Sequence, residues 1–139
     1  MYLRQHYKSP SVPTPTYVVV PARQRLTIDV RNATALSLVP ETIRRAAAES
    51  TYDGSMDVVI NCQRCVPPPS VIELRILAET LADSGEVAGP VAVLVPGVPV
   101  AALRYNLDHT LSPWVACQLQ VFGDAESMES WLAQSETVV

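Results

Sequence analysis

Glycine is scarce in this chain and is never clustered. The 139 residues contain five glycines, each isolated from the next by at least three other residues. Phosphate-binding loops need glycines at short fixed spacings, because backbone amides must approach the phosphates closely, and neither G-x-x-x-x-G-K nor G-x-G-x-x-G is present. The G-x-S-x-G pattern of a serine nucleophile is also missing. These absences exclude the usual sequence signatures of nucleotide-binding proteins and serine hydrolases, and we expect a chain that is not an enzyme.

Metal-ligand patterns are missing as well. The chain has three cysteines and two histidines, and neither His6 nor His109 has a second ligand three to five residues away. A zinc site needs four protein ligands, or three and a water. We therefore expect no metal and no cofactor.

No long hydrophobic run is available for a membrane. The longest uncharged stretch, residues 87–103, is 17 residues long and is broken by glycines and prolines, whereas a span needs about 20 apolar residues. Prolines also interrupt residues 1–21, so no signal peptide is recognisable. With few cysteines and no export signal, the prediction is a cytoplasmic protein without a membrane span.

Charge is present but is distributed unevenly. Residues 1–45 carry seven cations and two anions, a net charge of +5, and the remainder carries three cations and twelve anions, a net charge of −9. The basic residues are spread over several expected elements rather than one face, which argues against a nucleic-acid partner. We expect a salt-sensitive contact between the basic N-terminal part and the acidic body, with an acidic partner as the alternative.

The first half of the chain predicts two strands, a helix and a third strand. Residues 1–16 are polar and rich in proline, typical of an extended arm, so a single domain is expected over residues 17–139. The run 17–20 and the alternating run 26–30 predict antiparallel neighbours. A helix is expected from Pro40 to Ser50, with Ser37 as its N-cap and Ile43, Ala46 and Ala47 on one face. The apolar run 57–61 predicts a central strand buried on both faces.

The second half alternates strands and helices. Ser70 and Glu73 form a capping box for a helix with Leu74, Leu77, Ala78 and Leu81 on one face. A buried strand over 91–95, a helix with Val100, Leu103 and Leu107 on one stripe, an edge strand over 115–121 and a final helix capped by Asp124 follow. The fold class is therefore α/β, a mixed sheet of about five strands with helices packed on it, in the order β-β-α-β-α-β-α-β-α.

The C-terminal half carries a family resemblance. The string GPVAVLVPG at 89–97, the helix with Ala102 to Tyr105, and LQVFGDAESMESWL at 119–132 resemble small bacterial proteins of the STAS fold, the anti-sigma-factor-antagonist type that is also similar to CRAL-TRIO domains. The matching features are Val121-Phe122, Asp124 and Trp131-Leu132. The resemblance spans about residues 17–134 and concerns mostly structural positions.

The resemblance implies protein binding rather than catalysis. STAS antagonists bind an anti-sigma kinase and are switched by phosphorylation at the turn after the central strand, which here is residues 61–70. The usual Asp-Ser-x-Gly motif is missing, and Ser70 is the only hydroxyl in that turn. A plain helix cap is the favoured interpretation of Ser70 and a phosphoswitch is the alternative.

The same turn contains a C-x-x-C motif, Cys62 and Cys65. Between a strand and a helix, such a pair is typical of thioredoxin-like redox sites, since a helix N-terminus stabilises a thiolate. However, Pro67 to Pro69 separate both thiols from the helix start. Loop or buried cysteines are the favoured interpretation, with a dithiol redox protein or a metal half-site as alternatives.

Two further binding sites are candidates. Open α/β sheets bind ligands at the carboxyl ends of their strands, which would group Asn61, Cys62, Pro96, Gly97 and Arg104 around a small apolar ligand or lipid. The edge strands at 17–20 and 115–121 and the aromatic Trp114 would suit an interface, so a homodimer is favoured over a monomer. For Trp114 itself, covering the end of the core is the favoured interpretation and an interface is the alternative. The sequence as a whole predicts a STAS-like domain that acts by binding a protein partner or itself.

Overall fold

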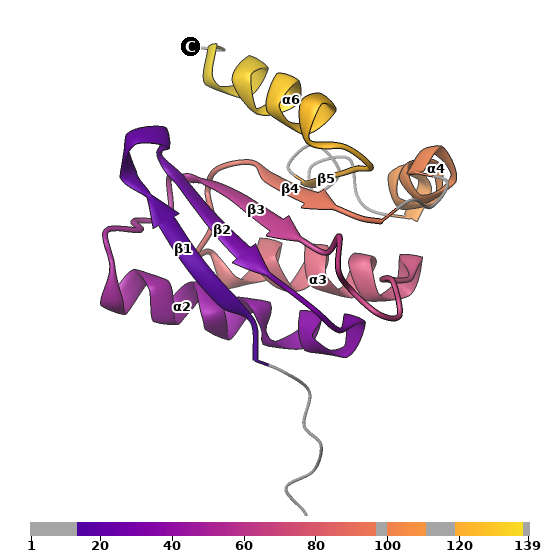
Figure 1. The fold of residues 1–139 in the computed structure, drawn as a ribbon, viewed down its shortest axis with the longest axis horizontal. Coiled ribbons are helices and arrows are strands. Elements are labelled where there is room, and N and C mark those ends of the chain that lie inside the picture. Colours follow the sequence, from indigo (N-terminus) through magenta and orange to yellow (C-terminus); the bar gives the residue numbers. More distant parts are fainter. Residues whose placement is uncertain (1–13, 97–99, 111–118, 138–139) are drawn as a thin grey trace, which may run out of the picture.

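The computed structural model describes residues 14–96, 100–110 and 119–137. They form an α/β fold with one five-stranded mixed sheet in the order β1-β2-β3-β4-β5, with helices on both faces (Figure 1). The elements are β1 (Thr16–Val20), β2 (Arg25–Asp29), α2 (Val39–Glu49), β3 (Asp57–Asn61), α3 (Val71–Ser84), β4 (Val91–Leu94), α4 (Val100–Thr110), β5 (Leu119–Phe122) and α6 (Ala125–Thr137). The predicted fold class and element order are confirmed.

The first two strands form an antiparallel hairpin, as predicted. A short 3₁₀ turn, η1 (Pro21–Arg23), connects them, and Gln24 closes the turn in the left-handed region at a φ of 52°. The register places Val18 opposite Thr27 and Val20 opposite Arg25. β1 begins at Thr16, so the sheet includes the last residue assigned to the arm.

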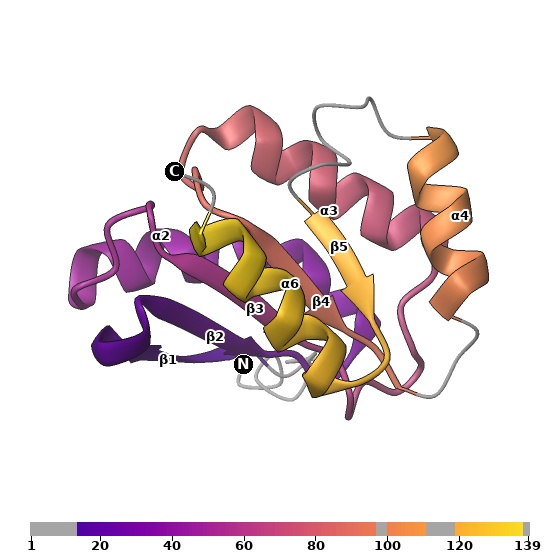
Figure 2. The same ribbon diagram turned by 90° about the horizontal axis from the view of Figure 1, so that it is seen from above.

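The remaining strands are parallel and lie in chain order across the sheet. Right-handed crossovers that always advance in one direction leave their helices on one face. α2 and α3 accordingly lie below the sheet and α6 lies above it, while α4 packs beside β5 and against α3 (Figures 1 and 2). Among the described strands, β1 and β5 are the two edges of the sheet.

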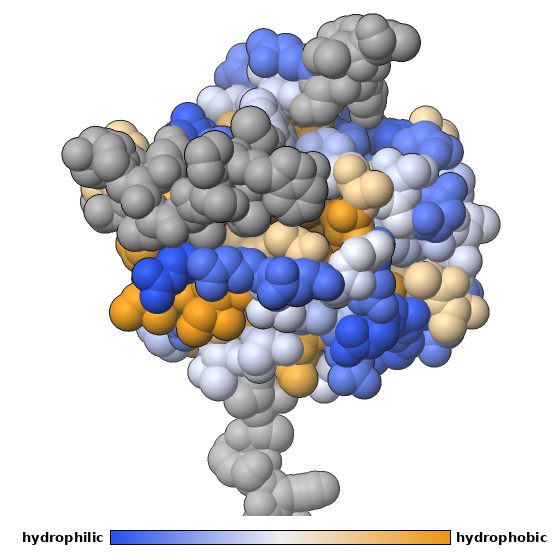
Figure 3. Space-filling view, turned by 180° about the vertical axis from the view of Figure 1, so that it is seen from behind, coloured by the Kyte–Doolittle hydropathy of each residue, from blue (hydrophilic) through white to orange (hydrophobic). Residues whose placement is uncertain are grey.

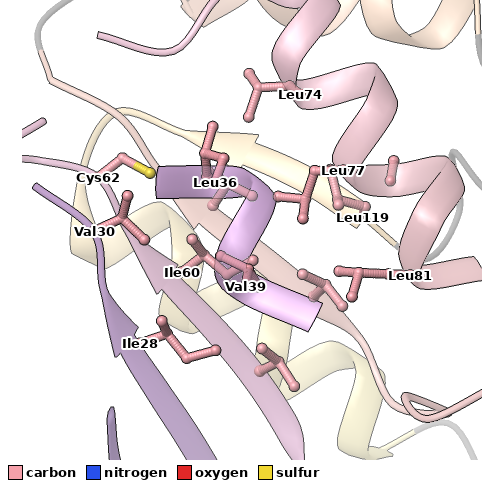
Figure 4. Packing of buried hydrophobic residues seen from close by; sticks show 14 of the residues in the cluster. Ile28, Val30, Leu36, Val39, Ile60, Cys62, Leu74, Leu77, Leu81 and Leu119 are labelled. Atoms are coloured by element: carbon pink, nitrogen blue, oxygen red, sulfur yellow. The ribbon is translucent and has the colours of Figure 1, made fainter. Parts of the chain in front are cut away.

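The core divides into two clusters, one on each face of the sheet. The larger lies between the sheet and α2, α3 and α4, and includes Ile28, Ile60 and Leu74 (Figure 4). The smaller lies under α6 and consists of Val59, Ala92, Leu94, Phe122, Met128 and Leu132. β3 contributes to both, so the prediction of a central strand buried on both faces is confirmed.

The start of α2 differs from the prediction. A 3₁₀ helix, η2 (Ala33–Leu38), precedes it and is capped by Asn32, whose side chain accepts from the Thr34 amide. Ser37 lies inside η2 and donates to the Thr34 carbonyl, so it is not the N-cap of α2. Ala47 is exposed, whereas Ile43 and Ala46 are buried as expected. Pro40 does lie in the first turn, where its missing amide costs nothing.

Candidate functional site

Three of the predicted site residues meet at the carboxyl end of β3. Asn61 ends the strand, and its side-chain oxygen accepts from the Gln63 amide at 3.0 Å, which turns the chain. The Cys62 amide donates to the Leu94 carbonyl at 2.8 Å, and the Cys65 amide donates to the Cys62 carbonyl at 3.0 Å. Hydrogen bonds within the turn and to Leu94 on β4 therefore fix its backbone.

The two thiols point into the core rather than toward solvent. Cys62 is 0% exposed and Cys65 is 3% exposed, and Figure 4 shows Cys62 beside Val30 and Leu36. Burial raises the pKa of the Cys62 thiol far above its ordinary value, and burial also raises the pKa of Cys65. A raised thiol pKa disfavours the thiolate, which is the nucleophile in dithiol exchange. The environment is that of structural cysteines, both of which are free.

Ser70 lies where the sequence placed it, at the N-cap of α3. Its Oγ accepts from the Glu73 amide at 3.2 Å, and the Ser70 amide donates to Glu73 Oε1 at 2.9 Å, so the capping box is complete. The helix begins at Val71, six residues after Cys65, which confirms that the thiols lie outside its first turn. Ser70 is exposed.

Arg104 lies at the carboxyl end of β5. Its Nη2 donates to the Val121 carbonyl at 2.6 Å, and its guanidinium lies 5.0 Å from the centre of the Phe122 ring. Both contacts are to β5, which is separated from β3 by β4. Phe122 pairs with Leu94, and Leu94 pairs with Asn61, so Arg104 lies at the carboxyl edge of the sheet that was expected to form the site, two strands away from Asn61. Gly97 and Trp114 lie outside the described residues.

The structure adds a surface that our sequence interpretation missed. Val66, Ile72 and Ile76 are 74%, 60% and 55% exposed, and the two isoleucines lie one turn apart on α3. We call Ile72 and Ile76 the α3 face, and Val66 lies in the turn before the helix. The signal was present in the sequence, because Ile72 and Ile76 are apolar residues at i and i+4 that fall outside the buried stripe of Leu74, Leu77 and Leu81.

A shallow apolar pocket of about 300 Å³ adjoins the α3 face. Ile76 is part of its wall, and Glu73 and Thr80 add polar groups on the same helix. Across the pocket stand η2 and the start of α2. The residues lining it are Ala33, Thr34, Leu36, Ser37, Pro40, Glu73, Ile76, Leu77 and Thr80.

The basic N-terminal part contacts the acidic body, as predicted. Arg25 makes two hydrogen bonds of 2.8 Å to the two carboxylate oxygens of Glu129, and Arg23 reaches the same carboxylate at 3.4 Å. Arg44 contacts Glu86 at 3.5 Å. The Arg25 hydrogen bonds, with its charge, hold the pKa of Glu129 below its ordinary value. The basic N-terminal part and the acidic body thus form ion pairs within one molecule.

Within the part of the chain that the structure describes, no group of three or more histidine, cysteine, aspartate or glutamate side chains could hold a metal ion. Among the same residues, every helix is too short or too polar to cross a bilayer. Comparisons of the chain with protein-family models, with curated proteins and with solved structures found no match. The STAS-like assignment rests on the sequence resemblance alone and stays a prediction.

Proposed function

We propose that this chain is a non-enzymatic, STAS-like module that binds a protein partner through the α3 face. The observation that carries the proposal is the exposure of Ile72 and Ile76 on a helix whose opposite side already fills the core. Apolar side chains at i and i+4 stabilise the helix itself only slightly, whereas contiguous apolar surface rimmed by polar groups is typical of a binding site. Figure 3 views the α3 side and shows hydrophobic surface beside a band of hydrophilic residues.

The pocket beside Ile76 specifies the kind of partner that fits. Its volume of about 300 Å³ accommodates one or two apolar side chains, and Glu73 and Thr80 offer an acceptor and a hydroxyl at its side. A protein segment that places a leucine or phenylalanine in the pocket and polar groups around it would match this pattern, because interface anchors fill pockets at the centre of a polar rim.

The position of the surface agrees with the role that the resemblance implies. In STAS antagonists the partner kinase acts at the turn before this helix. Here that turn ends at Ser70, which is exposed and precedes Ile72 by two residues. Ser70 and the α3 face would therefore lie under one partner, and a phosphate on Ser70 would place negative charge beside Glu73 within that contact.

The two alternatives fit the structure less well. A dithiol redox protein needs an accessible thiolate, and both thiols are buried with raised pKa values. A carrier of a small apolar ligand needs an enclosing apolar cavity. The pocket beside Ile76 holds about 300 Å³, the lower limit for ligand sites. A second pocket, of about 690 Å³ beside α2, has the charged groups Arg44, Asp53 and Glu86 in its lining.

The test compares three immobilised proteins as baits for a lysate of the source cells. They are the wild type, the double variant Ile72→Glu/Ile76→Glu, and the control Ala47→Glu/Ala48→Glu, which adds the same charge at exposed positions of α2. We expect a partner that the wild type and the control retain equally and that the α3 variant retains roughly tenfold less or not at all, because charges would stand where apolar anchors dock.

The proposal is contradicted if all three baits retain the same proteins in the same amounts. Native mass spectrometry of the purified wild type addresses the carrier alternative directly. If the wild type carries a small molecule at a one-to-one ratio and the α3 variant does not, the α3 face binds a ligand rather than a protein.

A further inference from the structure

The two edges of the sheet are treated differently. At the β5 edge, α4 packs against the strand, and Arg104 donates to the Val121 carbonyl at 2.6 Å. The β5 edge is thus contacted by α4 and by the Arg104 side chain. At the β1 edge, the elements among the described residues that pack on the strand are β2, beside it, and α2, below it (Figures 1 and 2).

β1 also lacks the features that keep edge strands from pairing. Soluble proteins protect an edge with lysines, internal prolines, bulges or a covering element. β1 reads Thr-Tyr-Val-Val-Val, without a charge or a proline, and its register with β2 is continuous from Thr16 to Val20. In an antiparallel ladder, alternate residues direct their amide and carbonyl away from the neighbouring strand. β1 therefore presents backbone donors and acceptors along its outer side.

The strand is held in place for such pairing. The Tyr17 hydroxyl donates to Glu49 Oε1 at 2.7 Å, and the Arg45 guanidinium lies 5.6 Å from the centre of the Tyr17 ring. Arg45 also donates to the Pro15 carbonyl at 3.4 Å. These contacts fix β1 to α2 from below, so little conformational freedom would be lost when a further strand adds to the edge.

We propose that β1 pairs antiparallel with β1 of a second copy of this chain, about a two-fold axis at Val18, to form one sheet across a homodimer. In this register Val18 faces its own copy, Thr16 faces Val20, and Tyr17 faces Val19. Val18 is 61% exposed in the single chain, and the symmetric pair would cover both copies of it. A β-branched pair directly opposite across strands is favourable.

Two features favour a second copy over a foreign strand. Pro15 and Pro21 stand immediately outside the strand, and since proline has no amide to donate, the ladder is limited to the five residues between them, a length that the identical strand matches. Below the strand, Arg45 and Glu49 contact Tyr17, the neighbour of Val18. Each copy would therefore bring a cation and an anion near the axis, where the cation of one copy can attract the anion of the other.

Sedimentation of the full chain over a wide concentration range tests the proposal. We expect the wild-type mass to rise from 15.1 kDa toward twice that value with concentration. Val18→Lys and Val18→Glu should each remain at the monomer mass, because like charges would face each other at the axis. An equimolar mixture of the two variants should associate again, because the introduced lysine and glutamate would then be paired. At a concentration where the wild type is monomeric, the exposure of Val18 predicts that both variants keep the circular dichroism and thermal midpoint of the wild type. At concentrations where the wild type is dimeric, association itself should raise the wild-type midpoint above those of the variants.

A wild type that stays at 15.1 kDa at every concentration would overturn the proposal. So would the finding that β1 pairs only with a strand from another protein. A Val18→Lys chain that associates as the wild type does would place any dimer interface elsewhere. Failure of the mixture to associate would reject the axis at Val18. Ile76→Glu serves as the matched control and should dimerise normally, so that loss of the partner at the α3 face and loss of the dimer are separate results.

Discussion

Cys62 and Cys65 show how local chemistry follows burial rather than motif. Their spacing matches a redox dithiol, yet both side chains lie in the core and their pKa values are raised by burial. A thioredoxin-like site lowers a thiol pKa by placing it at a helix N-terminus, whereas α3 begins after Ser70, beyond three prolines. These cysteines act as small apolar residues of the core.

Burial of Cys62 and Cys65 predicts that their thiols react slowly in the folded protein. In a Cys117→Ser background, Cys62 and Cys65 should react with a disulfide-forming thiol reagent at neutral pH at least roughly a hundredfold more slowly in the native protein than in denaturant, because reaction needs both opening and ionisation. The denatured protein is the control for reagent activity. Two thiols that react at once in the native state would restore the redox alternative.

At the scale of single elements, α3 combines the clearest local signals in the chain with two of the four exposed large hydrophobic side chains among the described residues. Ser70 and Glu73 satisfy its first amides, and Gly85 ends it in the left-handed region at a φ of 70°. Leu74, Leu77 and Leu81 hold it on the sheet, which leaves Ile72 and Ile76 for a partner. The helix is thus anchored independently of the face proposed for binding.

The cap gives a stability prediction for this element. Ser70→Ala should lower the free energy of unfolding by about 1 kcal/mol, since the Glu73 amide loses its acceptor. Chemical denaturation of the variant measures the change. Thr51→Ala, which removes an exposed hydroxyl in a loop, is the control and should cost far less. Equal effects of the two substitutions would contradict a stabilising cap.

At the scale of the whole molecule, α6 joins the two halves of the chain. It covers the smaller core cluster over β3, β4 and β5, and Glu129 reaches past these strands to Arg25 on β2. Arg25 is 9% exposed, so this ion pair is partly shielded from water on its cationic side. The contact connects the first hairpin with the last helix.

This contact predicts a pH dependence of stability. The pKa of Glu129 is lower in the folded protein than its ordinary value of 4.5, so the folded state binds fewer protons than the unfolded state below that pH. The stabilisation is present above pH 4.5 and is lost as the pH falls through the folded pKa. Denaturation midpoints measured from neutral pH into the acid range should fall less steeply for Glu129→Gln than for the wild type. Parallel curves would show that the pair contributes nothing measurable.

Local sequence determined the elements of this protein. Period-two runs, the Ser70 capping box, the Asp124 cap and the apolar stripe of α3 all depend on neighbours a few residues apart, and each was predicted with the correct element type. Ser37 was the exception, because a serine near a proline also suits a 3₁₀ turn, and Asn32 formed the competing cap. The resemblance to STAS proteins predicts a class of function, protein binding, which the structure does not test.

Tertiary structure decided what these elements expose and what they bury. The Arg25–Glu129 pair joins residues 104 positions apart. The inward direction of Cys62 and the exposure of Ile72 and Ile76 depend on how the sheet and helices pack. So does the difference between the sheet edges, since among the described residues β1 is contacted by β2 and α2, whereas α4 packs on β5. Spacing along the chain determines which face of an element is apolar, but the solvent exposure of that face depends on the partner packed against it. The element order could therefore be predicted from the sequence, whereas the candidate binding surfaces could not.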